Sequence, residues 1–214
     1  MHVPDGLLNP AVWGGGWILG GGGLAFALWK ARRALEGHLI PLAGVMAAFI
    51  FAAQMLNFPV LPGVSGHLVG GALAAIVLGP SLGTVVVFVV LLIQSLLFGD
   101  GGITALGLNT ISMALIGSYG GYALYRLVGG SKPTGARRWI AAFIAGFGAT
   151  VVAAAVTGLA LALSLPYPPG TLLGLMISYH ALIGLGEGVI TALVIGVLAG
   201  SKLLEPKLEG GELG

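Results

Sequence analysis

Seven apolar segments, separated by short stretches rich in glycine and proline, limit what this chain can fold into. A helix needs about 20 apolar residues to cross the hydrocarbon core of a bilayer. Charged residues make up only 7% of the chain, against roughly 25% in soluble domains. The predicted spans are residues 12–29, 40–56, 68–78, 82–98, 104–127, 139–163 and 172–199. We therefore expect an all-α, polytopic membrane bundle with seven transmembrane helices.

The chain length of 214 residues suits a single integral membrane domain. Its predicted parts are an N-terminal loop over residues 1–9, the spans within residues 10–200, and a tail over residues 201–214. The segment 68–78 is too short to cross a bilayer alone, so we expect protein to surround it. The chain also holds 39 glycines, which let helix backbones approach closely in lipid.

The basic residues predict the orientation, because cytoplasmic loops carry an excess of lysine and arginine. Every basic residue falls on one side of the predicted topology. These residues are Lys30, Arg32, Arg33, Arg126, Lys132, Arg137, Arg138, Lys202 and Lys207. We therefore expect the N-terminus outside and the C-terminus in the cytoplasm. A net charge of +2 gives no reason to expect a nucleic-acid partner.

The first two residues carry the strongest chemical signal. No basic stretch precedes the first apolar segment, so no secretory signal is predicted and Met1 is expected to be the mature N-terminus. The Met1 amine, the His2 amide nitrogen and His2 Nδ1 would close two fused chelate rings on a metal ion. Displacing the amide proton is feasible for Ni²⁺ or Cu²⁺, and nearly coplanar nitrogens suit a square-planar ion.

His67 is the candidate for a fourth nitrogen ligand, because it ends the outer loop before the third predicted span. A capping or interfacial role for His67 stays open on spacing alone. The chain has no cysteine, which excludes a thiolate metal site. Ligand deprotonation implies that metal binding weakens at low pH.

Several polar residues lie within or beside the apolar segments. Polar groups at membrane depth usually face the bundle interior. Asn109 and His180 are expected to orient the N-terminal loop or its imidazoles, with interhelical hydrogen bonding as the alternative. Asp5 precedes a glycine, which is typical of a turn, so we interpret it as a loop-folding residue. Glu187 is expected to be protonated or paired.

The opening Met-His-Val-Pro-Asp-Gly-Leu-Leu resembles the Met-His-Ile-Pro-Asp-Gly-Phe-Leu opening of CbiM/NikM proteins. These are substrate-binding (S) components of energy-coupling factor transporters for cobalt and nickel, and the resemblance implies the inner or plasma membrane of a prokaryote. The segment 65–71 and the seven-span plan also fit this family. The resemblance implies that the N-terminal loop inserts into the bundle and holds the ion through Met1, His2 and His67. Pro4-Asp5 resembles the nickel branch, so Ni²⁺ is the expected transported substrate and Co²⁺ the second candidate.

The resemblance also implies partners: a transmembrane coupling (T) component, ABC-type ATPases and, as a further candidate, a small accessory membrane subunit. No Gly-x-x-x-x-Gly-Lys-[Ser/Thr] loop occurs, so the chain is not expected to be the ATPase or an enzyme. In related S components an Ala-x-x-x-Ala face meets the T component. Ala43, Ala47, Ala48 and Ala52 could form that face, with packing inside the monomer equally open.

Two alternative functions remain at this stage. One is a secondary metal permease or channel that works without partner subunits. The other is an intramembrane metalloenzyme that holds Zn²⁺ through His2, His67 and His180, although no His-Glu-x-x-His motif is present.

Overall fold

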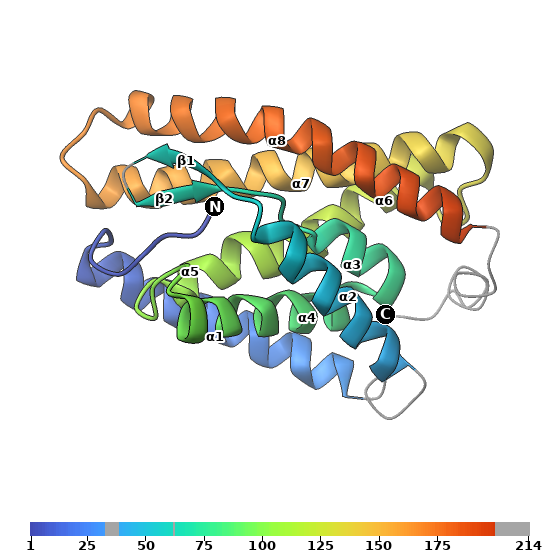
Figure 1. The fold of residues 1–214 in the computed structure, drawn as a ribbon, viewed down its shortest axis with the longest axis horizontal. Coiled ribbons are helices and arrows are strands. Elements are labelled where there is room, and N and C mark those ends of the chain that lie inside the picture. The colour runs from blue at the N-terminus through green and yellow to red at the C-terminus, as the bar shows by residue number, and fades with distance from the viewer. Residues whose placement is uncertain (33–38, 62, 200–214) are drawn as a thin grey trace.

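The computed structural model describes residues 1–32, 39–61 and 63–199. Most of its helices run roughly parallel to one long axis, and a small hairpin lies at the same end as the N-terminal loop (Figure 1). The elements are α1 (Pro10–Ala31), α2 (Leu39–Gln54), β1 (Phe58–Leu61), β2 (Val64–Gly66), α3 (Gly71–Leu78), α4 (Pro80–Ile93), η2 (Gln94–Phe98), α5 (Leu106–Asn109), η3 (Thr110–Gly120), α6 (Gly121–Gly129), α7 (Gly135–Ser164) and α8 (Pro169–Leu198).

Helical residues occupy all seven of the predicted ranges, and the described chain is mostly helical as predicted. Four of the described helices are long and apolar enough to cross a membrane: Pro10–Ala31, Pro80–Phe98, Gly135–Ser164 and Pro169–Leu198. Helix α2 is apolar but has only 16 residues. The number of spans and the orientation of the termini stay predictions. The predicted cytoplasmic tail, residues 201–214, lies outside the described residues.

Among the described residues, the β1–β2 hairpin differs from the predicted all-α fold. Strands β1 and β2 pair antiparallel, with Phe58 opposite Gly66 and Leu61 opposite Val64. Pairing satisfies backbone groups that an extended segment between apolar helices would otherwise leave without partners. The hairpin returns the chain to the bundle at His67, directly before α3.

Helix α3 is short because glycines bound it at both ends. Gly70 has a φ of 77° and Gly79 a φ of 85°, and Pro80 then begins α4. All eight residues of α3 are buried, as expected for a segment too short to cross lipid alone. A Cβ on Gly71 would lie 2.6 Å from the backbone of Gly117, so glycine allows α3 to pack directly on η3.

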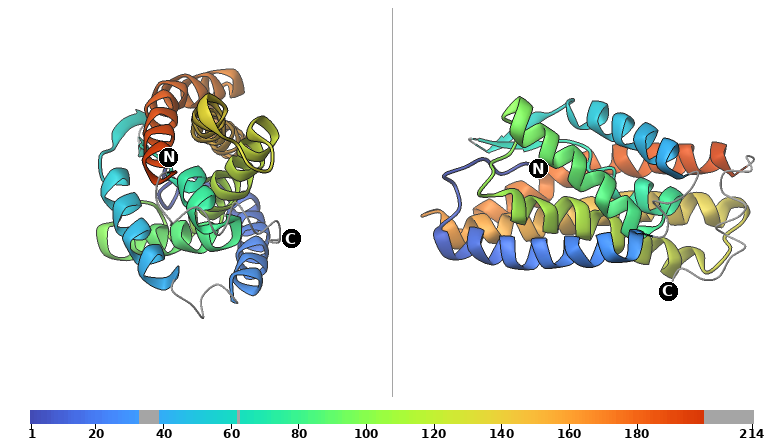
Figure 2. Two further views of the ribbon diagram at one scale, coloured as in Figure 1. Left: turned by 90° about the vertical axis from the view of Figure 1, so that its right-hand side faces the viewer. Right: turned by 90° about the horizontal axis from the view of Figure 1, so that it is seen from below.

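The start of α1 determines where the N-terminal loop leaves the helix. Asn9 Oδ1 accepts a hydrogen bond from the Val12 N–H at 3.0 Å, and Pro10 occupies the first helical turn, where its missing N–H costs nothing. Asn9 Nδ2 also donates to Leu163 O at the end of α7. With α1 fixed at this end, residues 1–8 fold back into the bundle, and the N-terminus lies within its outline in both views of Figure 2.

Candidate metal centre

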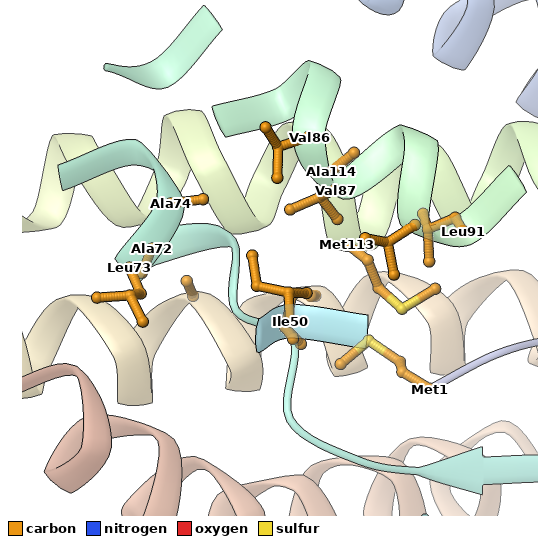
Figure 3. Packing of buried hydrophobic residues seen from close by; sticks show 14 of the residues in the cluster. Met1, Ile50, Ala72, Leu73, Ala74, Val86, Val87, Leu91, Met113 and Ala114 are labelled. Carbon is orange, nitrogen blue, oxygen red and sulfur yellow. The ribbon is translucent and has the colours of Figure 1, made fainter. Parts of the chain in front are cut away.

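The N-terminal loop is part of the protein interior. Met1 and Val3 are 0% exposed and His2 is 2% exposed. The Met1 side chain points toward Met113, in the apolar cluster that also contains Ile50 and Leu91 (Figure 3). A chain terminus is normally solvated and mobile, so its burial here requires specific contacts that hold it.

Asn109 and Gly102 provide these contacts at Val3. Asn109 Oδ1 accepts from the Val3 N–H at 3.1 Å, and Asn109 Nδ2 donates to Val3 O at 3.2 Å. The Gly102 N–H also donates to Val3 O, at 2.9 Å. The Asn109 side-chain amide therefore pairs with the Val3 backbone as a neighbouring strand would. Asn109, which the sequence placed among residues orienting the loop, contacts that loop directly.

Asp5 anchors the second half of the loop. Its Oδ1 accepts from the Thr104 N–H at 2.7 Å and from Thr104 Oγ1 at 2.5 Å, and its Oδ2 accepts from the Ile103 N–H at 3.2 Å. These hydrogen bonds, first of all that from the Thr104 hydroxyl, lower the pKa of Asp5. Both carboxylate oxygens are thus engaged in holding residues 103–104, which is a loop-folding arrangement.

The segment Gly99–Gly102 forms a cradle for the loop, a role that its turn-like composition did not predict. A Cβ on Gly101 would lie 3.0 Å from His2 Cδ2, and a Cβ on Gly102 would lie 2.2 Å from the Asp5 nitrogen. Gly101 also has a φ of 90°, which favours glycine. The only available signal was the density of glycines, because their contacts arise between distant segments.

Asp100 lies in this cradle against His2. Its Oδ1 is 3.3 Å from His2 Nδ1, outside hydrogen-bonding geometry, and the two would form an ion pair only with the imidazole protonated. Asn57 Nδ2 donates to Asp100 Oδ2 at 3.4 Å, which links the cradle to the start of the hairpin. The Asp100 carboxylate therefore lies between the buried imidazole of His2 and the exposed side chain of Asn57. Sequence analysis did not single it out.

The two imidazoles predicted as ligands meet in the structure. The rings of His2 and His67 stack with centroids 4.5 Å apart and an interplanar angle of 27°. His67 Nδ1 lies 2.6 Å from Leu68 O, so it carries the proton and leaves Nε2 as a base. His67 Nε2 and both ring nitrogens of His2 are buried without hydrogen-bond partners. Buried nitrogens without hydrogen-bond partners destabilise a fold and are rare in proteins. Their presence here is consistent with a site whose nitrogen lone pairs bind a cation.

Burial also adjusts the protonation of these groups. Desolvation lowers the pKa of the Met1 amine well below 8.0 and that of His67 well below 6.5. Desolvation lowers the pKa of His2 as well, while Asp100 partly opposes the shift. All three basic groups therefore favour the neutral form, in which their nitrogen lone pairs are available to a metal.

His180 and Gln94 complete the buried polar groups of this region. His180 Nδ1 lies 2.8 Å from Met176 O, its Nε2 has no hydrogen-bond partner, and it is close enough to His67 to interact electrostatically. Gln94 is 0% exposed, and both ends of its amide are buried without hydrogen-bond partners. Gln94 falls within the predicted span 82–98, and its place in that span did not predict a position near the N-terminal loop.

Main-chain nitrogens lie beside the two imidazoles and add to the donors that a metal ion could meet here. Within residues 1–32, 39–61 and 63–199, no group of three His, Cys, Asp or Glu side chains is arranged to hold a metal. The remaining donors are the Met1 amine and the His2 amide nitrogen, which adjoin the His2 ring. Nitrogens predominate among these donors, and nitrogen ligands suit Ni²⁺, Cu²⁺ or Co²⁺ better than the hard cations Mg²⁺ and Ca²⁺.

The predicted alanine face of α2 divides into two stripes. Ala43 is 9% exposed and belongs to the apolar core, and Ala47 is half-buried. Ala48 and Ala52 are exposed, together with Gly44 one turn earlier. Because a helix turns about 100° per residue, the two Ala-x-x-x-Ala pairs point in different directions. Burial of Ala43 favours the alternative of packing inside the monomer for that residue, and the docking role of the four alanines stays a prediction.

Comparison with known proteins identifies the class to which this fold and this site belong. Residues 2–203 match the CbiM family, described as the cobalt uptake substrate-specific transmembrane region. A putative metal transport protein of Haloquadratum walsbyi is 43% identical over 204 residues, covering 94% of this chain and 91% of the relative. A putative fused nickel transport protein NikMN of Archaeoglobus fulgidus is 42% identical, covering 100% of this chain and 71% of the relative.

The solved structures agree with the sequence relatives. A crystal structure of a transition metal transporter superposes with a TM-score of 0.84 at 30% identity, covering 98% of this chain and 100% of that one. The chain is thus a multi-pass membrane transport protein, a substrate-specific component for metal uptake. It belongs to the CbiM family. The alternative of an intramembrane metalloenzyme is set aside, because the relatives are named as metal transport proteins.

Proposed function

We propose that this protein captures Ni²⁺ from outside the cell in a square-planar site of four nitrogens. The ligands are the Met1 amine, the His2 amide nitrogen, His2 Nδ1 and His67 Nε2. The observation that carries the proposal is the pairing of His2 with His67, whose rings lie 4.5 Å apart in a buried place. A single ion held by the chelating dipeptide and one further imidazole would give partners to two of the unpaired ring nitrogens, His2 Nδ1 and His67 Nε2.

The preference for Ni²⁺ rests on the chemistry of the ligand set. Binding to the His2 amide nitrogen requires loss of its proton, which a strongly polarising, square-planar ion favours. The ion and the amide nitrogen together keep a net positive charge, and the Asp100 carboxylate beside His2 balances it. Co²⁺ is the second candidate, in keeping with the names of other relatives, such as a cobalt transport protein CbiM of Chlorobium limicola.

Transport itself is assigned to a complex. The protein loaded with Ni²⁺ docks onto a transmembrane coupling (T) component, to which ABC-type ATPases supply energy. The exposed stripe of Gly44, Ala48 and Ala52 on α2 is the proposed contact, since small residues allow close helix packing in a membrane. ATP-driven tilting of the bundle then exposes the ion to the cytoplasm.

Calorimetry on the purified protein with no N-terminal tag tests the ligand set. One residue added before Met1 displaces the amine, so Ni²⁺ affinity should fall sharply. His67→Ala should also weaken binding strongly. His38→Ala is the control and should not, although His38 lies outside the described residues. Unchanged affinity in the extended protein would rule out the chelate.

The competing proposal is a permease that works alone. Proteoliposomes containing only this chain distinguish the two, because a capture subunit binds Ni²⁺ without moving it across the membrane. Uptake of Ni²⁺ in the absence of any ATPase would favour the permease.

A further inference from the structure

A buried carboxylate on α8 lies behind the proposed metal centre, at a place that the ligand set does not use. Glu187 is 3% exposed and accepts three hydrogen bonds. Its Oε2 accepts from the Val69 N–H at 2.7 Å and from Thr150 Oγ1 at 2.6 Å. Its Oε1 accepts from the Gly70 N–H at 2.8 Å. The three donors come from α7 and from the segment that follows His67.

The segment His67–Gly70 is held from two sides at this point. Gln54, at the end of α2, donates from Nε2 to Val69 O at 2.8 Å, opposite the Glu187 bond to the Val69 N–H. Both polar groups of Val69 are therefore fixed by buried side chains from different helices. His67 lies two residues earlier, with its own Nδ1 bonded to Leu68 O. These contacts thus fix the backbone two residues along the chain from His67.

The backbone of this segment needs such support. Gly70 has a φ of 77° and no side-chain cap for α3. A Cβ on Gly70 would lie 2.8 Å from Ile50, and one on Gly66 would lie 2.8 Å from Ile183, so the segment passes closely between α2 and α8. The Glu187 carboxylate accepts from the N–H groups of Val69 and Gly70, which precede α3 and have no partner within that helix. Helix α8 thereby determines the position of the chain that carries His67.

We infer that Glu187, held by Thr150, is a positioning residue for metal capture, acting by fixing Val69 and Gly70 so that His67 Nε2 meets the ion. This inference rests on the proposed role of His67 as a ligand. Groups that orient metal ligands typically change affinity by roughly 10- to 100-fold when they are removed. Glu187→Gln keeps the size of the side chain. It also places an N–H₂ group, itself a donor, against the donors of Val69, Gly70 and Thr150.

Ni²⁺ affinity, measured by competition with a coloured chelator, tests the inference in a double-mutant cycle. Glu187→Gln should weaken binding roughly 10- to 100-fold in the wild-type background. In the His67→Ala background, where Met1 and His2 still chelate, it should have almost no further effect, because Glu187 acts through His67. Equal losses in both backgrounds would overturn the inference, since they indicate long-range charge or general destabilisation.

Variants at Thr150 keep the inference testable if Glu187→Gln does not fold. Thr150→Val removes one hydrogen bond to Glu187 and should weaken binding, whereas Thr150→Ser keeps the hydroxyl and should restore it. The matched control is Thr157→Val on the same helix, where the hydroxyl bonds only to Ala153 O. Equal affinities for the Thr150→Val and Thr157→Val proteins would also overturn the inference.

The same measurements separate this inference from the proposed function. If His67→Ala binds Ni²⁺ as tightly as the wild type, the proposed ligand set fails. If His67→Ala loses affinity while Glu187→Gln and Thr150→Val keep it, the ligand set stands and the positioning role alone is refuted.

Discussion

Replacement of Asn109 by alanine should release the N-terminal loop, because this side chain carries the docking of Val3. The variant leaves the buried Val3 N–H unpaired and removes one of the two donors to Val3 O, while Gly102 keeps the other. An unpaired buried group and a lost hydrogen bond together cost about 2 to 4 kcal/mol. If this free energy destabilises the docked state of the loop relative to the undocked state, Ni²⁺ affinity drops roughly 30- to 700-fold.

Titration calorimetry of Ni²⁺ into the detergent-solubilised protein, with no tag before Met1, measures this loss. The matched control is Asn57→Ala, which removes a 3.4 Å hydrogen bond to Asp100 at an exposed position and should have little effect. Thermal unfolding of the metal-free proteins separates loop release from loss of the whole fold. A decrease of less than about threefold for Asn109→Ala would refute the reasoning, because it corresponds to well under 1 kcal/mol.

Three further predictions concern the cradle, the docking stripe and pH. Gly102→Ala should abolish high-affinity binding in calorimetry, because its Cβ would meet the Asp5 nitrogen at 2.2 Å, whereas Gly170→Ala, with nothing within 4 Å, should bind normally. Ala48→Leu should reduce co-purification with the T component and leave Ni²⁺ affinity unchanged, unlike Ser178→Leu on the exposed face of α8, which should change neither. Burial lowers the pKa values of the Met1 amine, His2 and His67, so these groups bind protons more tightly when the loop is undocked. Low pH therefore favours the undocked state and the release of Ni²⁺. Affinity should therefore begin to fall below pH 8.0, the ordinary value of the amine, and fall more steeply below 6.5, the ordinary imidazole value. A constant affinity from pH 6.5 to pH 5, roughly 30-fold more protons, would contradict this.

The helical content and the chemistry of the first two residues were readable from the sequence. Apolar runs of sufficient length form helices in lipid whatever their neighbours, because backbone hydrogen bonds must be satisfied within the segment. The amine, amide and imidazole of Met1-His2 are adjacent by covalent structure, so their ability to chelate depends on no other part of the chain. The short α3 and its need for surrounding protein followed from its length in the same way.

Only the tertiary structure brought the distant parts of the site together. It placed His67 against His2, Asn109 against Val3 across 106 positions, and Glu187 behind the His67 segment across 118 positions. It also showed that Ala43 faces inward while Ala48 faces outward. These contacts depend on how whole helices pack, and uniformly apolar helices carry no periodic pattern that identifies the buried face. The sequence therefore determined which groups can hold a metal, and the fold decided which of them meet.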